Sequence, residues 1–332
     1  MSSTEPKWNT VFVHGIFSSG AIFKPMAEAF AKNPAIAGCA TFDYDYNAKL
    51  TENAARLAEE LAKIAAPVVL VGHSMGGLIA RLAVLGGDVP NVRRVVMLGT
   101  PNFGAIRTST AGLLAQLMLR ATGKLAAVFR RPGILELTRV PKIFEQPIRK
   151  GEANARQVEY VTIPGTFFNE SREVTDIGKW RHSSAVTAFF AFLEIGGDLL
   201  NQFPLWKSEI ARPHDGIVEE RSNALIPWGP GRNSEKSATL LEREIWGSTY
   251  AHVWIRQCDE LTHVGLHSDP EVIQLVSGLA GSESLSKWFD GLAPAERLRL
   301  QLKVEPDLPY PHSPKPPVRR RRASVATATT RL

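Results

Sequence analysis

The chain has 332 residues, of which 44% are hydrophobic and 22% charged, and its formal net charge is +6. This balance is typical of a soluble globular protein with a sizeable core, and it excludes a highly charged disordered chain. Two cysteines exclude a disulfide framework, and the apolar runs are shorter than the roughly 20 residues that a membrane-spanning helix needs.

The first hundred residues alternate strand and helix patterns at short intervals. Strands are predicted over 10–15, 38–46, 67–72 and 92–99, and helices over 21–33, 53–65 and 75–86. The strand that begins at Pro67 is apolar enough to be buried on both faces. Such alternation predicts an α/β domain with a mostly parallel sheet covered by helices, which we expect to span 1–305.

The pattern changes after Gly104. No strand pattern occurs over 104–156, where an apolar helix is predicted at 111–129, and we expect this segment to be an insertion. A strand is predicted at 158–165, a second insertion over about 168–212, and the last core strand at 248–257. A closing helix is predicted to begin at Pro270, because proline is favoured in the first helical turn.

Residues 306–332 are rich in proline and arginine and predict a disordered tail. The run Arg319–Arg322 leaves two interpretations open: a solvated segment, which we favour, or a weak contact with an anionic surface. No aromatic residues are interleaved with the arginines, so nucleic-acid binding is not expected. The N-terminal residues lack the charged and apolar segments of a secretory signal, which predicts a cytoplasmic location.

The motif GHSMGG at 72–77 lies between the predicted strand 67–72 and the predicted helix 75–86. A serine on a sharp strand-to-helix turn needs glycines around it, because side chains there would collide with neighbouring backbone. Such a turn exposes the hydroxyl of Ser74 and directs the positive end of the helix toward developing negative charge. The pattern therefore predicts that Ser74 is a nucleophile.

A second motif, VHGIF, places His14 and Gly15 at the end of the first predicted strand. An oxyanion hole needs two backbone N–H donors aimed at one oxygen. We expect one donor to be the amide of Met75, directly after the serine, and the other to be that of Ile16, with Phe17 next in line. His14 itself is interpreted as a residue that shapes the loop.

Together VHGIF, GHSMGG and LGTPNFG resemble the α/β-hydrolase superfamily, and in particular its bacterial lipase and esterase branch, over about residues 10 to 280. The resemblance implies an α/β-hydrolase fold with helices on both faces of the sheet. It also implies a helical cap over 104–156, after the strand that follows the nucleophile helix. In that branch the acid and the base follow the serine in the order Ser, Asp, His.

The resemblance also implies the other two members of a catalytic triad. Asp215, in the segment DGIV, is similar to the acid of this branch, and Asp176 is the alternative. His263, in THVGLH, is similar to the base that lies ahead of the closing helix, with His267 as the alternative. The aspartate would orient the imidazole, which would take the serine proton and return it to the leaving group.

We therefore expect a carboxylic ester hydrolase of class EC 3.1.1, an esterase or lipase that acts on a small-molecule ester or lipid. Histidines and carboxylates show no metal-ligand spacing, and no metal or cofactor is expected. An acyltransferase that uses the same triad and a binding or sensor protein without turnover remain alternatives. The residues expected to contact substrate are Phe17, His73, Leu113 and Leu117.

Overall fold

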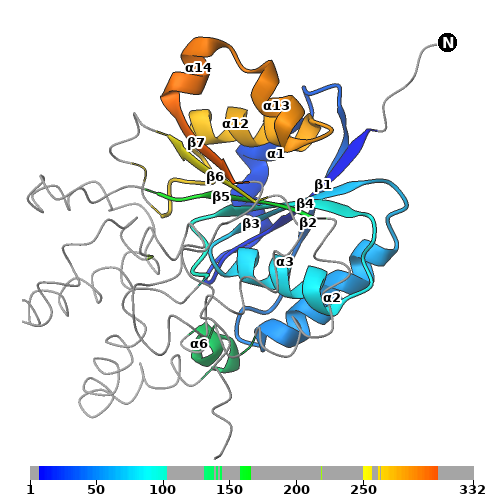
Figure 1. Cartoon of the computed structure of the whole chain (residues 1–332). Coiled ribbons are helices and arrows are strands. Elements are labelled where there is room, and N and C mark those ends of the chain that lie inside the picture. Colours follow the sequence, from blue (N-terminus) through cyan, green and yellow to red (C-terminus); the bar gives the residue numbers. More distant parts are fainter. Residues whose placement is uncertain are drawn as a thin grey trace, which may run out of the picture.

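The computed structural model describes residues 7–102, 131–137, 140, 143, 158–165, 218, 250–255, 261 and 263–305. Within these residues lies a seven-stranded sheet of order β2-β1-β3-β4-β5-β6-β7 (Figure 1). The pairs from β2 to β6 are parallel, and β7 pairs antiparallel with β6. The mostly parallel α/β sheet is confirmed. The strands are β1 Trp8–Val13, β2 Ile36–Phe42, β3 Val68–His73, β4 Val92–Leu98, β5 Glu159–Ile163, β6 Tyr250–Ile255 and β7 Leu300–Glu305.

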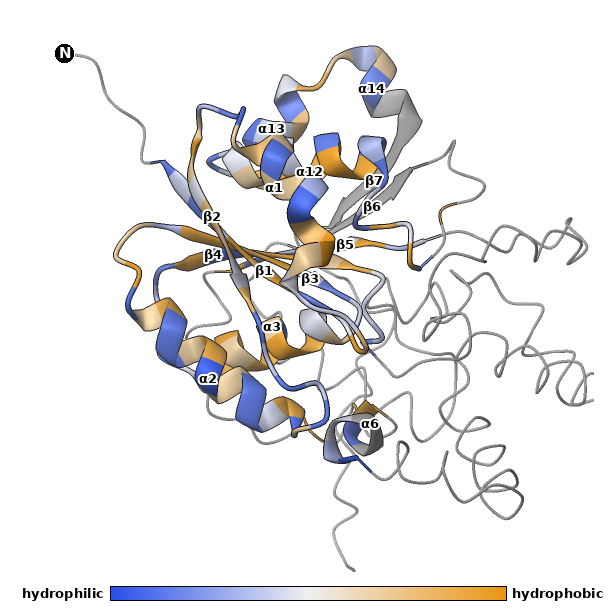
Figure 2. Cartoon of the chain, turned by 180° about the vertical axis from the view of Figure 1, so that it is seen from behind, coloured by the Kyte–Doolittle hydropathy of each residue, from blue (hydrophilic) through white to orange (hydrophobic). Residues whose placement is uncertain are grey.

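Helices cover both faces of the sheet, as expected (Figures 1 and 2). Helices α2 and α3 pack on the face that carries Val11 and Leu70, whereas α1, α12 and α13 pack on the face that carries Phe12 and Val71. Figure 2 shows that α2 turns hydrophilic residues away from the sheet. The described helices are the 3-10 turn η1 Gly20–Phe23, α1 Lys24–Phe30, α2 Leu50–Ala62, α3 Met75–Gly86, α6 Pro132–Leu137, α12 Pro270–Gly281, α13 Leu285–Gly291 and α14 Pro294–Arg299.

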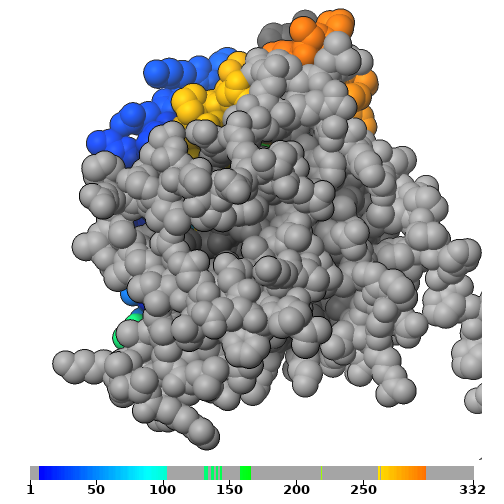
Figure 3. Space-filling view, turned by 90° about the vertical axis from the view of Figure 1, so that its left-hand side faces the viewer, coloured from blue at the N-terminus to red at the C-terminus, as the bar shows by residue number. Residues whose placement is uncertain are grey.

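The carboxyl ends of the central strands meet at one edge of the sheet. Val13 at the end of β1 pairs with Gly72, and His73 at the end of β3 pairs with Leu98 at the end of β4. In open α/β sheets ligands bind at this edge, because the loops that leave the strands converge there. Helix α1 contacts α12, so early and late parts of the chain lie side by side, as the blue and yellow-orange surfaces show (Figure 3).

Strand β2 differs from the predicted range 38–46, because it begins at Ile36 and ends at Phe42. Its neighbour β1 ends at Val13, which pairs with Phe42, so no partner strand continues beyond that point. The next two residues, Asp43 and Tyr44, bond instead to the loop that follows β1. An alternating D-Y-D-Y pattern was thus interpreted as strand where the chain has already left the sheet.

The prediction that 248–257 contains the last core strand is wrong. That segment forms β6, but β7 follows the closing helices and pairs with it from Tyr250↔Glu305 to Ile255↔Leu300. An unpaired strand edge leaves backbone N–H and C=O groups without partners, and β7 supplies them for β6. The closing helix α12 does begin at Pro270, with Asp269 as its N-cap.

An ion pair between neighbouring residues of β4 and β5 lies on the face of the sheet that α12 and α13 cover. Arg94 is fully buried, and its Nε donates to Glu159 Oε2 at 2.8 Å. Its guanidinium also donates to the carbonyl oxygens of Leu279 and Ser282, while Glu159 Oε1 accepts from the backbone N–H of Leu285 at 3.0 Å. Burial lowers the pKa of Arg94 below its ordinary value, and the Glu159 carboxylate opposes that shift. The pair therefore connects the sheet to the end of α12 and the start of α13.

Several predicted segments lie outside the described residues. These are the helix at 111–129, the second insertion at 168–212 and the tail at 306–332. The described part of the expected cap over 104–156 consists mainly of α6. In the part of the chain that is described, every helix is too short or too polar to cross a bilayer.

Candidate active site

Ser74 lies on the sharp turn between β3 and α3. Its backbone has φ 55° and ψ −124°, a region that non-glycine residues rarely adopt and that costs of order 1–3 kcal/mol. The turn is fixed from both sides, because the N–H of Ser74 donates to Leu98 O at 2.8 Å and its carbonyl accepts from the N–H of Gly77 at 3.1 Å. Backbone strain of this kind clusters at active sites and ligand clamps, so Ser74 is a candidate functional residue.

The glycines of GHSMGG are required by close backbone contacts. A Cβ at Gly76 would lie 2.1 Å from the carbonyl oxygen of Val13 and 2.4 Å from that of His14. A Cβ at Gly72 would lie 2.5 Å from the Cα of Gly77. These glycines let the start of α3 approach the end of β1, which brings the serine turn against the loop that follows β1.

The segment TPN after β4 contacts helix α3 from the other side. A Cβ at Gly77 would lie 1.9 Å from Thr100 Oγ1, so the helix packs directly on this segment. Arg81 of α3 and Asn102 are both buried, and the guanidinium donates to Asn102 Oδ1 at 2.6 Å. The motif LGTPNFG therefore contributes packing and a buried hydrogen bond that orient α3.

The loop after β1 lies against the serine. A Cβ on Gly15 would come within 2.9 Å of the Cβ of Ser74, so only glycine fits there. Ile16 packs on the core, and Met75, the first residue of α3, is buried. Phe17 has φ 56°, and among the described residues only it and Ser74 combine a side chain with a positive φ. Both lie where an oxyanion hole was predicted.

The proposed base, His263, lies beside the serine turn. Its carbonyl oxygen is 2.8 Å from Nε2 of His73, the residue that precedes Ser74, and their ring centroids are 5.0 Å apart. His263 is buried. The alternative base, His267, also contacts His73, with ring centroids 5.3 Å apart, and packs its edge on Phe23. The structure thus brings both candidate histidines against His73, the residue before Ser74.

His73 is a neutral histidine in this cluster. A carbonyl oxygen only accepts, so His73 must carry its proton on Nε2 to bond to His263. Burial lowers the pKa of His73 well below its ordinary value, and the neighbouring His263 and His267 lower it further. Burial likewise lowers the pKa of His267.

The predicted acid and part of the predicted substrate site fall in segments that the structure does not describe. Asp215, the alternative acid Asp176, and the predicted substrate contacts Leu113 and Leu117 lie outside the described residues. Of the predicted substrate contacts that are described, His73 is buried and Phe17 is partly exposed. No cluster of three or more metal-ligating side chains occurs among the residues that the structure describes.

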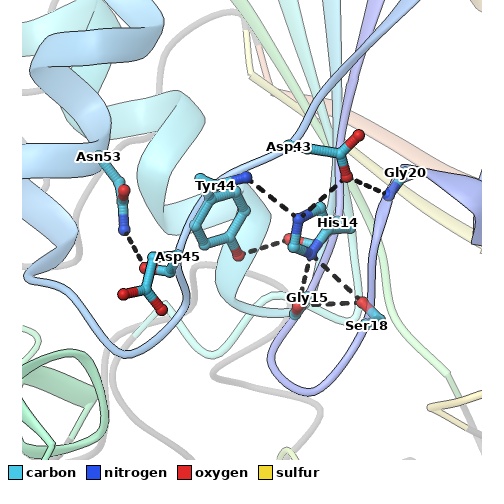
Figure 4. A network of polar contacts seen from close by, with 8 residues as sticks. All are labelled: His14, Gly15, Ser18, Gly20, Asp43, Tyr44, Asp45 and Asn53. Carbon is cyan, nitrogen blue, oxygen red and sulfur yellow. Dashed lines mark hydrogen bonds and ion pairs between the residues drawn. The ribbon is translucent and has the colours of Figure 1, made fainter.

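A polar network behind the loop was not predicted (Figure 4). It joins His14 to Asp43 and Tyr44, the two residues after β2, through contacts shown as dashed lines in the figure. The only sequence signal for it is an aspartate directly after a strand, at the sheet edge where functional loops gather. Alternating polar and aromatic residues concealed that signal.

A family model for alpha/beta hydrolases matches residues 10–273. The chain belongs to the alpha/beta hydrolase family. The position of Ser74 between β3 and α3 of this alpha/beta hydrolase agrees with the turn that carries the nucleophile in such folds. A search of curated proteins finds no match.

Several solved structures of bacterial proteins align with the chain. The propeptide form of the Bacillus licheniformis lipase BlEst2 aligns with a TM-score of 0.50 and 21% identity, over 84% of this chain and 51% of that one. This alpha/beta hydrolase thus spans about half the length of that protein. The mature form aligns with a TM-score of 0.41 and 24% identity, over 67% of this chain and 80% of that one. The lin2722 gene product of Listeria innocua aligns with a TM-score of 0.43 and 15% identity, over 81% of this chain and 92% of that one.

Proposed function

We propose that this alpha/beta hydrolase is a carboxylic ester hydrolase with Ser74 as its nucleophile. The observation that carries the proposal is the strained backbone of Ser74 at the start of α3, with the loop of Gly15 against it and His263 bonded to the preceding residue, His73. A serine is held in such a conformation when its hydroxyl must face a substrate rather than the protein interior.

In the proposed reaction His263 removes the proton from Ser74 as the oxygen forms a bond to the ester carbonyl carbon. The carbonyl oxygen becomes an oxyanion, which the amides of Met75 and Ile16 would stabilise. The C–O bond to the leaving alkoxide then breaks, and the alkoxide takes the proton from His263. Water repeats the sequence on the acyl-enzyme and releases the acid. We assign the orienting carboxylate to Asp215.

Steady-state hydrolysis of p-nitrophenyl esters from acetyl to palmitoyl tests the proposal on wild type, Ser74→Ala and His263→Ala. We expect kcat to fall by at least about 10³-fold in both variants, because the two groups act as one unit. Activity that survives in Ser74→Ala contradicts the mechanism. The chain-length profile separates an esterase from a lipase, and product analysis with an added alcohol separates hydrolysis from acyl transfer.

A fluorophosphonate probe provides a second test that does not depend on the choice of ester. We expect it to label wild type at Ser74 and to leave Ser74→Ala unlabelled, because the probe reports an activated serine. A folded wild-type protein that is not labelled and hydrolyses none of the esters would favour the binding or sensor alternative.

A further inference from the structure

The loop between β1 and η1 needs contacts that stabilise it, because its residue Phe17 has a positive φ. A bulky residue in that region costs of order 1–3 kcal/mol and persists only where the surroundings impose it. Asp43 and Tyr44, the two residues after β2, make hydrogen bonds to this loop that can impose such a conformation. We propose that Asp43 and Tyr44 are positioning residues that hold this loop in the shape in which its amides face Ser74. The inference rests on the proposed function, because the loop matters only if an oxyanion forms beside it.

Tyr44 contacts the first residue of the loop twice. Its hydroxyl donates to the carbonyl oxygen of His14 at 2.7 Å, and its ring stacks on the imidazole with centroids 4.3 Å apart and planes 12° apart (Figure 4). Burial raises the pKa of Tyr44 well above its ordinary value, so the hydroxyl keeps the proton that it donates. The carbonyl of His14 is the same one that Gly76 approaches, which links Tyr44 to the start of α3.

The imidazole of His14 connects Tyr44 to Gly15, the next residue of the loop. Its Nδ1 lies 2.8 Å from the carbonyl oxygen of Gly15, which only accepts, so the proton is on Nδ1. The bare Nε2 then accepts the backbone N–H of Tyr44 at 3.4 Å. Burial lowers the pKa of His14 below its ordinary value, although the bond to Gly15 and the Asp43 carboxylate both oppose the shift. A neutral His14 is the form that satisfies both bonds.

Asp43 holds the far end of the loop. Its Oδ1 accepts the backbone N–H of Gly20 at 2.6 Å, and a charge-assisted bond of this kind is stronger than a neutral one. Ser18 closes the middle of the loop by donating to the carbonyl oxygen of Gly15 at 3.0 Å. The two positioning residues therefore contact the loop at both ends, with Phe17 between them.

Tyr44→Phe removes the hydroxyl and keeps the ring, which makes it the sharpest test. We expect kcat for p-nitrophenyl butyrate to fall about three- to tenfold, the size of one neutral buried hydrogen bond felt in the transition state. We expect KM to change by less than about twofold, because the loop serves the oxyanion rather than the bound ester. Asp43→Asn weakens the bond to Gly20 and should act in the same direction.

Asn91→Ala is the matched control for a purely structural effect. The Asn91 amide donates to the carbonyl oxygens of Leu61 and Ile64 at the opposite edge of the sheet. This variant should lose stability and keep its kcat. A Tyr44→Phe protein with the kcat of wild type would overturn the inference, as would an equal loss of kcat in Asn91→Ala.

Amide hydrogen exchange on the intact protein provides a readout that does not depend on turnover. We expect peptides that cover residues 15–20 to exchange faster in Tyr44→Phe and Asp43→Asn, and to be unchanged in Asn91→Ala. Unchanged exchange in all three variants would contradict the positioning role. Activity that survives Ser74→Ala would instead contradict the proposed function. The exchange rates would then still show whether Asp43 and Tyr44 hold the loop.

Discussion

The imidazole of His73 donates from Nε2 to the carbonyl oxygen of His263 across 2.8 Å. The residue before the proposed nucleophile therefore holds the backbone of the proposed base. Both side chains are buried, so water does not compete for this bond. Ser74 and His263 come from segments nearly two hundred residues apart, and the bond from His73 joins these two segments directly.

His73→Leu removes that bond while keeping a side chain of similar bulk. We expect the loop of His263 to loosen, with kcat for ester hydrolysis lowered about tenfold and stability lowered by about 1 kcal/mol. His73→Gln retains an N–H donor and should keep more activity than His73→Leu. Urea unfolding and steady-state kinetics measure the two effects. Equal kcat in wild type and His73→Leu would show that the bond does not position the base.

The buried histidines make stability depend on pH. The pKa values of His14, His73 and His267 are all lowered in the folded protein, mainly by burial, from an ordinary value of 6.5. The unfolded chain therefore binds more protons in the window below pH 6.5 and above each folded pKa. Stability is fully present above that window and is lost as pH falls through it, by up to about 1.4 kcal/mol per pH unit for each histidine.

Urea unfolding at pH 7.5, 6.5 and 5.5 measures this loss. We expect the midpoint to change little from pH 7.5 to 6.5 and to fall from 6.5 to 5.5. Replacing His267 by Gln should make that fall smaller, because one neutral histidine is removed. A midpoint that rises on acidification would contradict the assignment of neutral histidines.

Two glycines of helix α3 should respond to alanine in opposite ways. Gly76→Ala places a methyl group about 2 Å from backbone oxygens, and we expect a loss of several kcal/mol or failure to fold. Gly86→Ala meets nothing within 4 Å and should stabilise the protein by about 0.4–1 kcal/mol through lower unfolded-state entropy. Thermal unfolding of both variants checks the contrast. A Gly76→Ala protein as stable as wild type would mean that α3 does not pack so closely on β1.

The ion pair between Arg94 and Glu159 should be sensitive to the loss of one partner. Glu159→Leu leaves the buried guanidinium without its carboxylate, and we expect a loss of about 3–5 kcal/mol. The double variant Arg94→Met/Glu159→Leu removes both charges and should recover much of that loss. Chemical denaturation of the three proteins gives the comparison. A double variant less stable than Glu159→Leu would show that the guanidinium bonds to the ends of α12 and α13 outweigh the charge pair.

Local patterns were sufficient to predict the strands from β1 to β6 and the sharp turn at Ser74 between β3 and α3. The spacing of glycine and serine in GHSMGG is a local signal, although Gly76 and Gly77 pack against the ends of β1 and β4 rather than within their own strand–turn–helix unit. Strand β7 was missed for the opposite reason. Its pairing with β6 joins segments about fifty residues apart, and the six residues LQLKVE carry too weak a pattern to compete with the helices before them.

The residues around the site were harder to predict because their roles depend on neighbours distant in sequence. Arg94 lies in a largely apolar strand, and the partners that explain its burial, Glu159 and the carbonyl groups at the end of α12, are distant in sequence. Asp43 and Tyr44 have no motif of their own, since their partners lie near residue 14. The acid of the proposed triad, Asp215, stays a prediction from resemblance.

The antiparallel pairing of β7 with β6 has a consequence for how the protein is made. Ribosomes synthesise β7 after every other described element. Until then the outer edge of β6 has no partner strand, although the rest of the sheet can already assemble. An open edge of this kind is a template for another chain. Synthesis of residues 300–305 thus gives β6 its second partner and makes β7 the outer strand in its place, whereas a truncation before Leu300 would leave the edge of β6 open.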